Sequence, residues 1–351
     1  MQMMRAVTLK GFGGTDMLQI SRIPRAAIAN PREILIKVSA AGINRADAMQ
    51  RQGHYPPPKG GCEVLGLEVS GVIEQVGPDV KRFKEGDKVM ALLGGGGYAE
   101  YAVAHEGSVM HIPQGYSFIE AASIPEAFLT AWQALKFHGN VRKGNHVLIH
   151  AGASGVGTAA SQVVEKYFEA VAVTTSSDAK VEVCKSFASI NLSRTPDESG
   201  LCFAPKIKNL LGEGSIDVVV DGVFGGSYIS EDAAVLAEDG RIVVIAFMGG
   251  AKVHLNCLPL LRQRAHIVFS KLRCQSNEYK ENLVKLFEQE VVPLMNQRVI
   301  VPVANKTYPL EEVSQAHARL EDSTAWGKIV LTVNNFMGTA STGGLPSPPG
   351  V

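Results

Sequence analysis

The sequence has no excess of charge of either sign. Lys plus Arg and Asp plus Glu each number 34 among 351 residues, so the formal net charge is zero. Proteins that bind nucleic acids or acidic membrane surfaces usually carry a basic patch or face. We therefore expect neither nucleic acid nor membrane among the partners. Cysteine is also scarce: five residues form no Cys-x-x-Cys pair, which argues against a disulfide framework or a structural zinc.

Long apolar runs are missing as well. No stretch of 18 apolar residues is present, and the first residues pass directly into a strand-like pattern without a targeting segment. We expect a cytoplasmic protein on this basis. Residues 334–351 are rich in Gly, Ser, Thr and Pro, a composition that cannot bury a core, and we expect them to form a disordered tail.

The length exceeds what one hydrophobic core usually supports, so two domains are expected. Residues 1–125 contain short apolar runs separated by Gly, Pro and Asp, which predict a β-rich domain. From residue 126 to 268, strand-like runs alternate with helix-length amphipathic segments, which predicts an α/β domain with a doubly wound parallel sheet. Its expected strands are 146–150, 170–174, 217–221 and 241–247, and its expected helices 156–167 and 227–237. Residues 269–333, with a helix at 279–291 and a strand at 325–331, return to the first domain.

A glycine-rich turn follows the first of these strands. It reads His150-Ala151-Gly152-Ala153-Ser154-Gly155-Val156-Gly157 and opens a helical pattern. Glycines at such a turn let backbone N–H groups approach a pyrophosphate at a helix N-terminus. The spacing is Gly-x-x-Gly-x-Gly, a weak signal alone but a much stronger one between a strand and a helix. We expect this turn to bind a nicotinamide dinucleotide; the alternative is a merely structural turn.

The end of the second strand bears on which dinucleotide binds. NAD enzymes place an acid there for the ribose 2′-OH, whereas a 2′-phosphate requires hydroxyls and a cation. Ser176, Ser177 and Lys180 supply those groups and favour NADPH. Asp178 is an acid close to the position expected in NAD enzymes, so NADH stays an alternative. It follows the strand end, however, and is equally suited to capping the next helix.

The sequence resembles the zinc-free quinone oxidoreductases of the medium-chain dehydrogenase/reductase superfamily, in particular the tumour-suppressor-inducible, zeta-crystallin-like subgroup. The likeness covers residues 4 to about 333. It is carried by residues 44–58, 124–131, 147–160, 221–228 and 327–331, including Pro125-Glu126-Ala127 and Gly327-Lys328-Ile329. It implies a GroES-like substrate domain with an inserted Rossmann domain, a homodimer joined through the Rossmann sheets, and NADPH-dependent reduction of quinones.

The resemblance also implies that no metal is bound. Alcohol dehydrogenases of the superfamily hold a catalytic zinc through Cys, His and an acid, and this chain has Asn44 and Leu67 at the Cys and His positions. Without those ligands there is no Lewis acid, which leaves metal-independent reduction of an electron-poor acceptor. No paired carboxylates or Ser/His/Asp set stand out either, in keeping with chemistry carried by the cofactor, with water supplying the proton.

The resemblance assigns roles to single residues. Asn44 and Tyr55 are expected at the substrate, where the Tyr55 phenol could stack on a quinone and donate a hydrogen bond; the alternatives are a loop tyrosine packed on prolines and an asparagine satisfying a turn. Lys180 could equally be a solvated lysine, and Met248 and Leu272 could be core residues. The residues implied at the cofactor are Thr130, Ser154, Gly155, Val156, Gly157, Ser176, Ser177, Lys180, Met248, Gly249, Gly250, Ser270, Leu272 and Arg273.

One segment departs from the family pattern. Residues 186–192 lack the usual Gly-Ala, and Leu192 stands where the family has a tyrosine facing the adenosine 2′-phosphate. This leaves open a catalytically weak NADPH-binding paralogue. A second alternative is an alkenal or enone reductase, which would use the same hydride on a carbon–carbon double bond.

Overall fold

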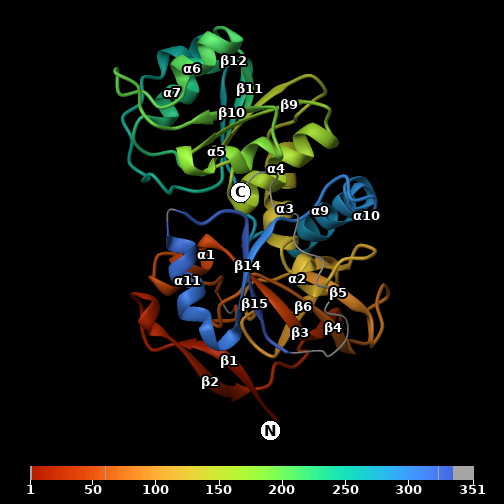
Figure 1. Cartoon of the computed structure of the whole chain (residues 1–351). Helices are drawn as coiled ribbons and strands as arrows, with labels where there is room; N and C mark the ends of the chain where they lie inside the picture. The colour runs from red at the N-terminus through yellow and green to blue at the C-terminus, as the bar shows by residue number, and fades with distance from the viewer. Residues whose placement is uncertain (1, 60, 323, 335–351) are drawn as a thin grey trace. The chain divides into compact units, whose positions relative to one another are not determined.

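A computed structural model describes residues 2–59, 61–322 and 324–334. The predicted tail lies almost wholly outside these residues. The described chain forms two compact units: unit 1 holds the residues up to Leu129 and those from Arg273 onward, and unit 2 is Thr130–Leu272. Unit 1 therefore contains both the red N-terminal strands and the blue segment with β14 (Ala304–Pro309), α11 (Val313–Glu321) and β15 (Lys328–Thr332) in Figure 1.

Unit 1 is built on a mixed sheet in the order β14-β15-β3-β4-β5-β7, with β6 pairing β3. Its strands are β3 (Glu33–Ile43), β4 (Glu68–Val76), β5 (Lys88–Leu92), β6 (Tyr101–His105), β7 (Val109–His111), β14 (Ala304–Pro309) and β15 (Lys328–Thr332), while β1 (Met3–Leu9) and β2 (Leu18–Pro24) form a separate hairpin. β15 pairs antiparallel with β3, joining Ile329 to Ile43. The last strand of the chain thereby completes a sheet begun near its start.

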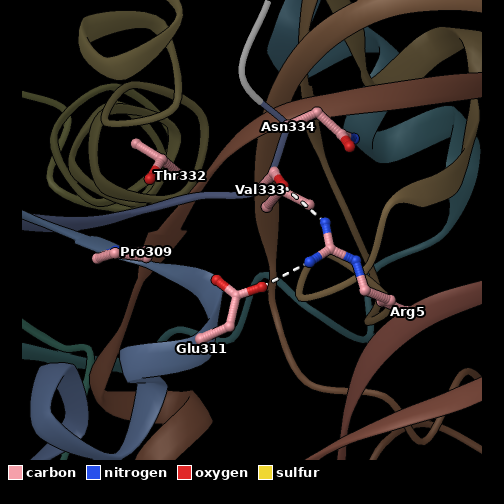
Figure 2. A pocket seen from close by; sticks show the side chains of 6 residues that line it. All are labelled: Arg5, Pro309, Glu311, Thr332, Val333 and Asn334. Carbon is pink, nitrogen blue, oxygen red and sulfur yellow. Dashed lines mark hydrogen bonds and ion pairs between the residues drawn. The ribbon is translucent and has the colours of Figure 1, made fainter.

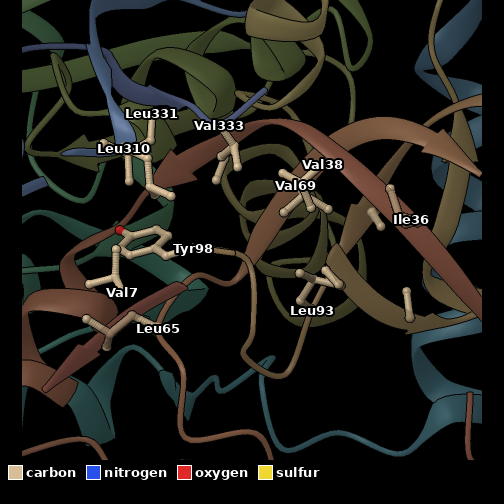
Figure 3. Close-up of a cluster of buried hydrophobic side chains, with 14 of the residues drawn as sticks. Val7, Ile36, Val38, Leu65, Val69, Leu93, Tyr98, Leu310, Leu331 and Val333 are labelled. Atoms are coloured by element: carbon tan, nitrogen blue, oxygen red, sulfur yellow. The ribbon is translucent and has the colours of Figure 1, made fainter. Parts of the chain in front are cut away.

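The core of unit 1 consists of aliphatic side chains from strands distant in sequence. Val38, Val69 and Leu331 are fully buried and belong to one cluster with the ring of Tyr98 (Figure 3). Burying such side chains stabilises the fold by about 1.5–3 kcal/mol each. The helices of unit 1 are α1 (Arg45–Arg51), α2 (Phe118–Ala121), α9 (Asn277–Glu290), α10 (Val292–Asn296) and α11 (Val313–Glu321), and α3 (Pro125–Trp132) passes from unit 1 into unit 2.

Unit 2 is a parallel sheet in the order β10-β9-β8-β11-β12-β13. The strands are β8 (His146–His150), β9 (Val171–Ser176), β10 (Ile190–Ser193), β11 (Ile216–Asp221), β12 (Leu236–Val244) and β13 (His266–Phe269), and the helices are α4 (Gly155–Lys166), α5 (Asp178–Lys185), α6 (Ala204–Leu211), α7 (Tyr228–Val235) and α8 (Leu258–Arg262). All six strands pair in parallel. The predicted fold class, a Rossmann-like α/β sheet plus a β-rich part, is confirmed.

Two predicted boundaries in unit 2 were wrong. The helix expected over 227–237 ends at Val235, because Leu236 turns to extended backbone and pairs with Ile216 of β11. The strand that follows starts five residues before the expected 241 and ends at Val244 rather than 247. It accommodates the early start through a bulge, and Asp239 in that bulge has a positive φ of 60°. Sheet pairing overrides local helix periodicity here.

Candidate functional site

The glycine turn of unit 2 joins β8 to α4 with very little space around it. Ser154 is the N-cap of α4, and its Oγ accepts a hydrogen bond of 3.0 Å from the Gly157 N–H. A Cβ on Gly157 would lie 2.5 Å from the carbonyl oxygens of Ala151 and Gly152. Only glycine fits, and the turn is therefore as tight as a pyrophosphate-binding turn requires. The first turn of α4 thus offers the N–H groups and positive dipole end that an anion needs.

A buried hydrogen-bond network anchors this turn from its first residue. The His150 imidazole, at the end of β8, accepts or donates at both nitrogens: Nδ1 lies 2.9 Å from Thr175 Oγ1 and Nε2 lies 2.7 Å from Asp232 Oδ1. Asp221, at the end of β11, holds the Val223 and Phe224 N–H groups. His150, Asp221 and Asp232 offer metal-ligand atoms within 4.8 Å of one another. Since both imidazole nitrogens already take part in hydrogen bonds, we interpret this group as structural.

The predicted 2′-phosphate residues lie at the end of β9 and directly after it. Ser176 is buried, and Ser177 is the N-cap of α5 without a side-chain cap bond. Lys180 is half-buried on the first turn of α5. The Asp178 carboxylate accepts a hydrogen bond of 2.6 Å from the Thr195 hydroxyl, and hydrogen bonds from Ser193 and Thr195 lower its pKa.

The divergent segment before Arg194 still forms a strand, β10, in which Leu192 pairs with Thr175. Leu192 packs on the apolar core of unit 2. Its side chain has no hydroxyl that could bind a 2′-phosphate. Arg194 follows directly, is exposed, and donates its backbone N–H to the Ser176 carbonyl at 2.8 Å. The backbone of a second cationic residue thus lies beside Ser176, while its guanidinium interacts with the Tyr228 hydroxyl. The sequence reasoning missed Arg194 because the segment did not match the family pattern.

The residues expected at the nicotinamide are dispersed over several loops. Met248 is 55% exposed, which excludes core packing for it, whereas Leu272 is 5% exposed and packs in the core. Gly249 donates its N–H to the Val223 carbonyl at 2.8 Å, and the Ser270 N–H binds the Val244 carbonyl at the same distance. Thr130 is half-buried within α3.

Arg273 lies in unit 1, where it supports the predicted substrate residue Tyr55. Its guanidinium donates to Gln50 Oε1 at 2.8 Å and to the Gly94 carbonyl at 2.9 Å, and its Cζ lies 5.4 Å from the centre of the Tyr55 ring. Burial raises the pKa of Tyr55 to about 12, so its hydroxyl keeps its proton near neutral pH.

Asn44 belongs to a buried polar cluster. Its Oδ1 accepts a hydrogen bond of 2.6 Å from Lys328 Nζ, and its Nδ2 donates to Glu68 Oε1 at 2.8 Å. Glu68 and Lys328 form an ion pair of 2.6 Å, and Glu68 Oε2 accepts the backbone N–H of Glu126. Asn44 therefore holds its two charged neighbours in place through both ends of its amide.

Asp47 is a further acid that contacts Asn44. It is fully buried and accepts hydrogen bonds from the Asn44 and Gly66 N–H groups and from the Tyr98 hydroxyl. Burial raises its pKa to about 6 against the lowering effect of these donors. The sequence contained a signal for this cluster that was not recognised. Glu68 and Lys328 are each the first residue of a strand whose next residues are buried. A charge at the head of a buried strand requires a partner.

A cavity of unit 1 is lined by other residues than these. It measures about 270 Å³, and Figure 2 shows Arg5 donating to Glu311 at its edge. Its lining consists of Arg5, Pro309, Glu311, Thr332, Val333 and Asn334. None of the predicted site residues is among them. Separately, no helix of the described residues has the length and apolar character needed to cross a membrane.

Comparisons with known proteins place this geometry in a family. The chain matches the alcohol dehydrogenase GroES-like domain over residues 30–114 and the zinc-binding dehydrogenase model over residues 201–331. It is 32% identical over 350 residues to the synaptic vesicle membrane protein VAT-1 homolog-like of Mus musculus, covering 95% of this chain and 82% of that one. It is 30% identical over 335 residues to the quinone oxidoreductase of Homo sapiens, covering 94% and 98%.

Solved structures give the same result. A mycobacterial protein complexed with NADPH has a TM-score of 0.82 and 28% identity, with 94% of this chain and 99% of that one covered. The CurK enoyl reductase has a TM-score of 0.82 and 26% identity, with 95% and 100% covered. The resemblance found in the sequence is thus confirmed: this chain belongs to the medium-chain dehydrogenase/reductase superfamily, among relatives that include quinone oxidoreductases and VAT-1-like proteins.

Proposed function

We propose that the chain is an NADPH-dependent, metal-independent reductase of quinones. The observation that carries the proposal is the turn at Gly157, which has no room for a side chain and leaves the first N–H groups of α4 to a pyrophosphate. The full-length similarity to a quinone oxidoreductase supports the choice of acceptor. NADPH is favoured by Ser176, Ser177 and Lys180 and by the NADPH complex of one similar structure.

The bound dihydronicotinamide would supply hydride. In this proposal Ser154, Gly155, Val156 and Gly157 bind the pyrophosphate, while Thr130, Met248, Gly249, Ser270 and Leu272 frame the nicotinamide. The substrate side is formed by Tyr55 and Asn44. Because the pKa of Tyr55 is about 12, its hydroxyl stays protonated and can donate a hydrogen bond to the quinone oxygen that gains charge. Arg273 holds the tyrosine through its contact with the ring and so acts as a positioning residue.

The test is steady-state oxidation of NADPH with a panel of quinones, compared with an enal and an enone at matched concentration. We expect turnover with quinones well above the enzyme-free rate. Faster turnover of the enal or enone would favour the second candidate, which the similarity to an enoyl reductase supports. NADPH binding without any turnover would contradict the reductase proposal and favour a binding paralogue.

A further inference from the structure

Glu126 stands in the polar cluster of unit 1 without an assigned role. It is the second residue of α3, and its backbone N–H donates to Glu68 Oε2 at 2.8 Å, which fixes the first turn of that helix. Its side chain is half-buried. Within the described residues its carboxyl group makes no hydrogen bond or ion pair. The backbone of Glu126 is thus fixed, while its carboxyl keeps its hydrogen-bonding capacity for a bound molecule.

Charged groups from several elements face this carboxyl. Acids are Glu68 of β4 and Asp47 of α1, and cations are Lys328 of β15 and Arg273. Lys280 of α9 and the Tyr55 hydroxyl also interact electrostatically with Glu126. The carboxyl therefore shares its surroundings with the residues proposed to bind the substrate.

The balance of these charges favours the neutral acid. Burial, followed by the charge of Glu68, raises the pKa of Glu126 to about 8, against the lowering influence of Lys328 and Arg273. Most of the carboxyl is thus protonated at neutral pH. Tyr55, with a pKa of about 12, is a poorer source of a proton under the same conditions.

We propose that Glu126 is the general acid that protonates the reduced acceptor, while Tyr55 orients that acceptor through a hydrogen bond. This rests on the proposed reductase function, and it replaces the expectation that water delivers the proton directly. Three observations carry the proposal: a carboxyl without a partner among the described residues, a helix turn fixed by Glu68, and surroundings shared with Tyr55 and Arg273.

Hydride brings two electrons to the quinone, which becomes a hydroquinone monoanion, and the dihydronicotinamide is oxidised. The O–H bond of Glu126 breaks, and a new O–H bond forms at the anionic oxygen of the acceptor. The Glu126 carboxylate then regains a proton from water before the next turnover.

Steady-state kinetics of Glu126→Gln against pH test the proposal. Wild-type kcat should fall through a pKa near 8, by about tenfold per pH unit above it. The glutamine variant should lose about 100-fold in kcat with little change in KM, and its profile should be flat over that range. Glu126→Asp should regain part of kcat. Glu311→Gln, which alters an acid beside Arg5 in the separate cavity, is the matched control and should behave like the wild type.

A second measurement needs no turnover. Infrared difference spectra of the free protein should contain a carboxyl that titrates near pH 8 in the wild type and is missing in Glu126→Gln. An active wild type whose glutamine variant keeps both its kcat and its alkaline limb would overturn the role of Glu126 and leave the reductase function standing. A wild type that turns over no acceptor would overturn the reductase function, and the acid role with it, whatever the infrared titration reports.

Discussion

Lys328 Nζ lies 2.6 Å from Glu68 Oε1, with only 5% and 0% of the two side chains exposed. Removing one member of a buried ion pair leaves the other charge without compensation. We expect Lys328→Met to lower the free energy of unfolding by about 3–5 kcal/mol. The double variant Lys328→Met/Glu68→Gln should lose clearly less than the sum of the single changes. Urea denaturation of all four proteins measures this coupling, and strictly additive losses would contradict it.

The preference for NADPH should depend on Lys180. We expect Lys180→Ala to weaken NADPH binding about 10- to 100-fold, the usual worth of a hydrogen bond to a charged group, and to leave NADH binding unchanged. Titrations followed by nucleotide fluorescence provide the measurement. Lys185→Ala is the control, since Lys185 lies on the same helix but pairs with Glu182. An equal loss for both nucleotides would mean that Lys180 does not contact the 2′-phosphate.

Stability should decrease in mild acid because of His317. Its imidazole is buried and its Nδ1 lies 3.3 Å from Arg51 Nη1; burial, followed by the charge of Arg51, lowers its pKa to about 3. The native state keeps this group neutral, whereas the unfolded chain takes up a proton below about pH 6.5. The stability it contributes is thus complete above that pH and falls by about 1.4 kcal/mol per unit as the pH drops toward 3.

Urea denaturation between pH 7 and 5 should therefore show a shallower loss for His317→Gln than for the wild type. His54→Gln, at an exposed loop position, should retain the wild-type slope. Parallel curves for His317→Gln and wild type would show that another group governs the acid sensitivity.

We expect the chain to form a homodimer through the β13 edge of the unit 2 sheet. Among the described strands β13 pairs only with β12, and Phe269 on it is 61% exposed beside Phe247, which is 45% exposed. An unpaired strand edge with exposed aromatic side chains is suited to pairing with a second copy. Sedimentation should give a dimer for the wild type and a dissociation constant at least 100-fold higher for Phe269→Glu. Leu210→Glu, 57% exposed on α6, should remain dimeric; a wild type that is monomeric at micromolar concentration would refute the dimer.

The parts of the fold with regular local patterns were predictable. The strand ending at His150, the glycine turn and the helix opening near Gly155 follow one another in sequence, so periodicity and turn chemistry determine them together. The boundary at Leu236 was not predictable in this way, because its strand conformation depends on pairing with Ile216. The candidate site was harder for the same reason.

Lys328 is 284 residues from Asn44 in the sequence, and no local pattern encodes their contact. The role of Arg273 illustrates this best. The resemblance assigned it to the cofactor, which stays a prediction, and no local pattern indicated that its guanidinium would also bind Gln50 and lie over the Tyr55 ring.

The pairing of β15 with β3 has a consequence for synthesis on the ribosome. The residues that flank β3 on this side, such as Ile329 and Leu331, are translated nearly 300 residues after their partners. Unit 2 is continuous in sequence and can fold as soon as it emerges, while the sheet of unit 1 must wait with an open edge. A nascent chain stalled shortly before β15 should therefore expose that edge to chaperones, and unit 1 should be the slower of the two to become protease-resistant.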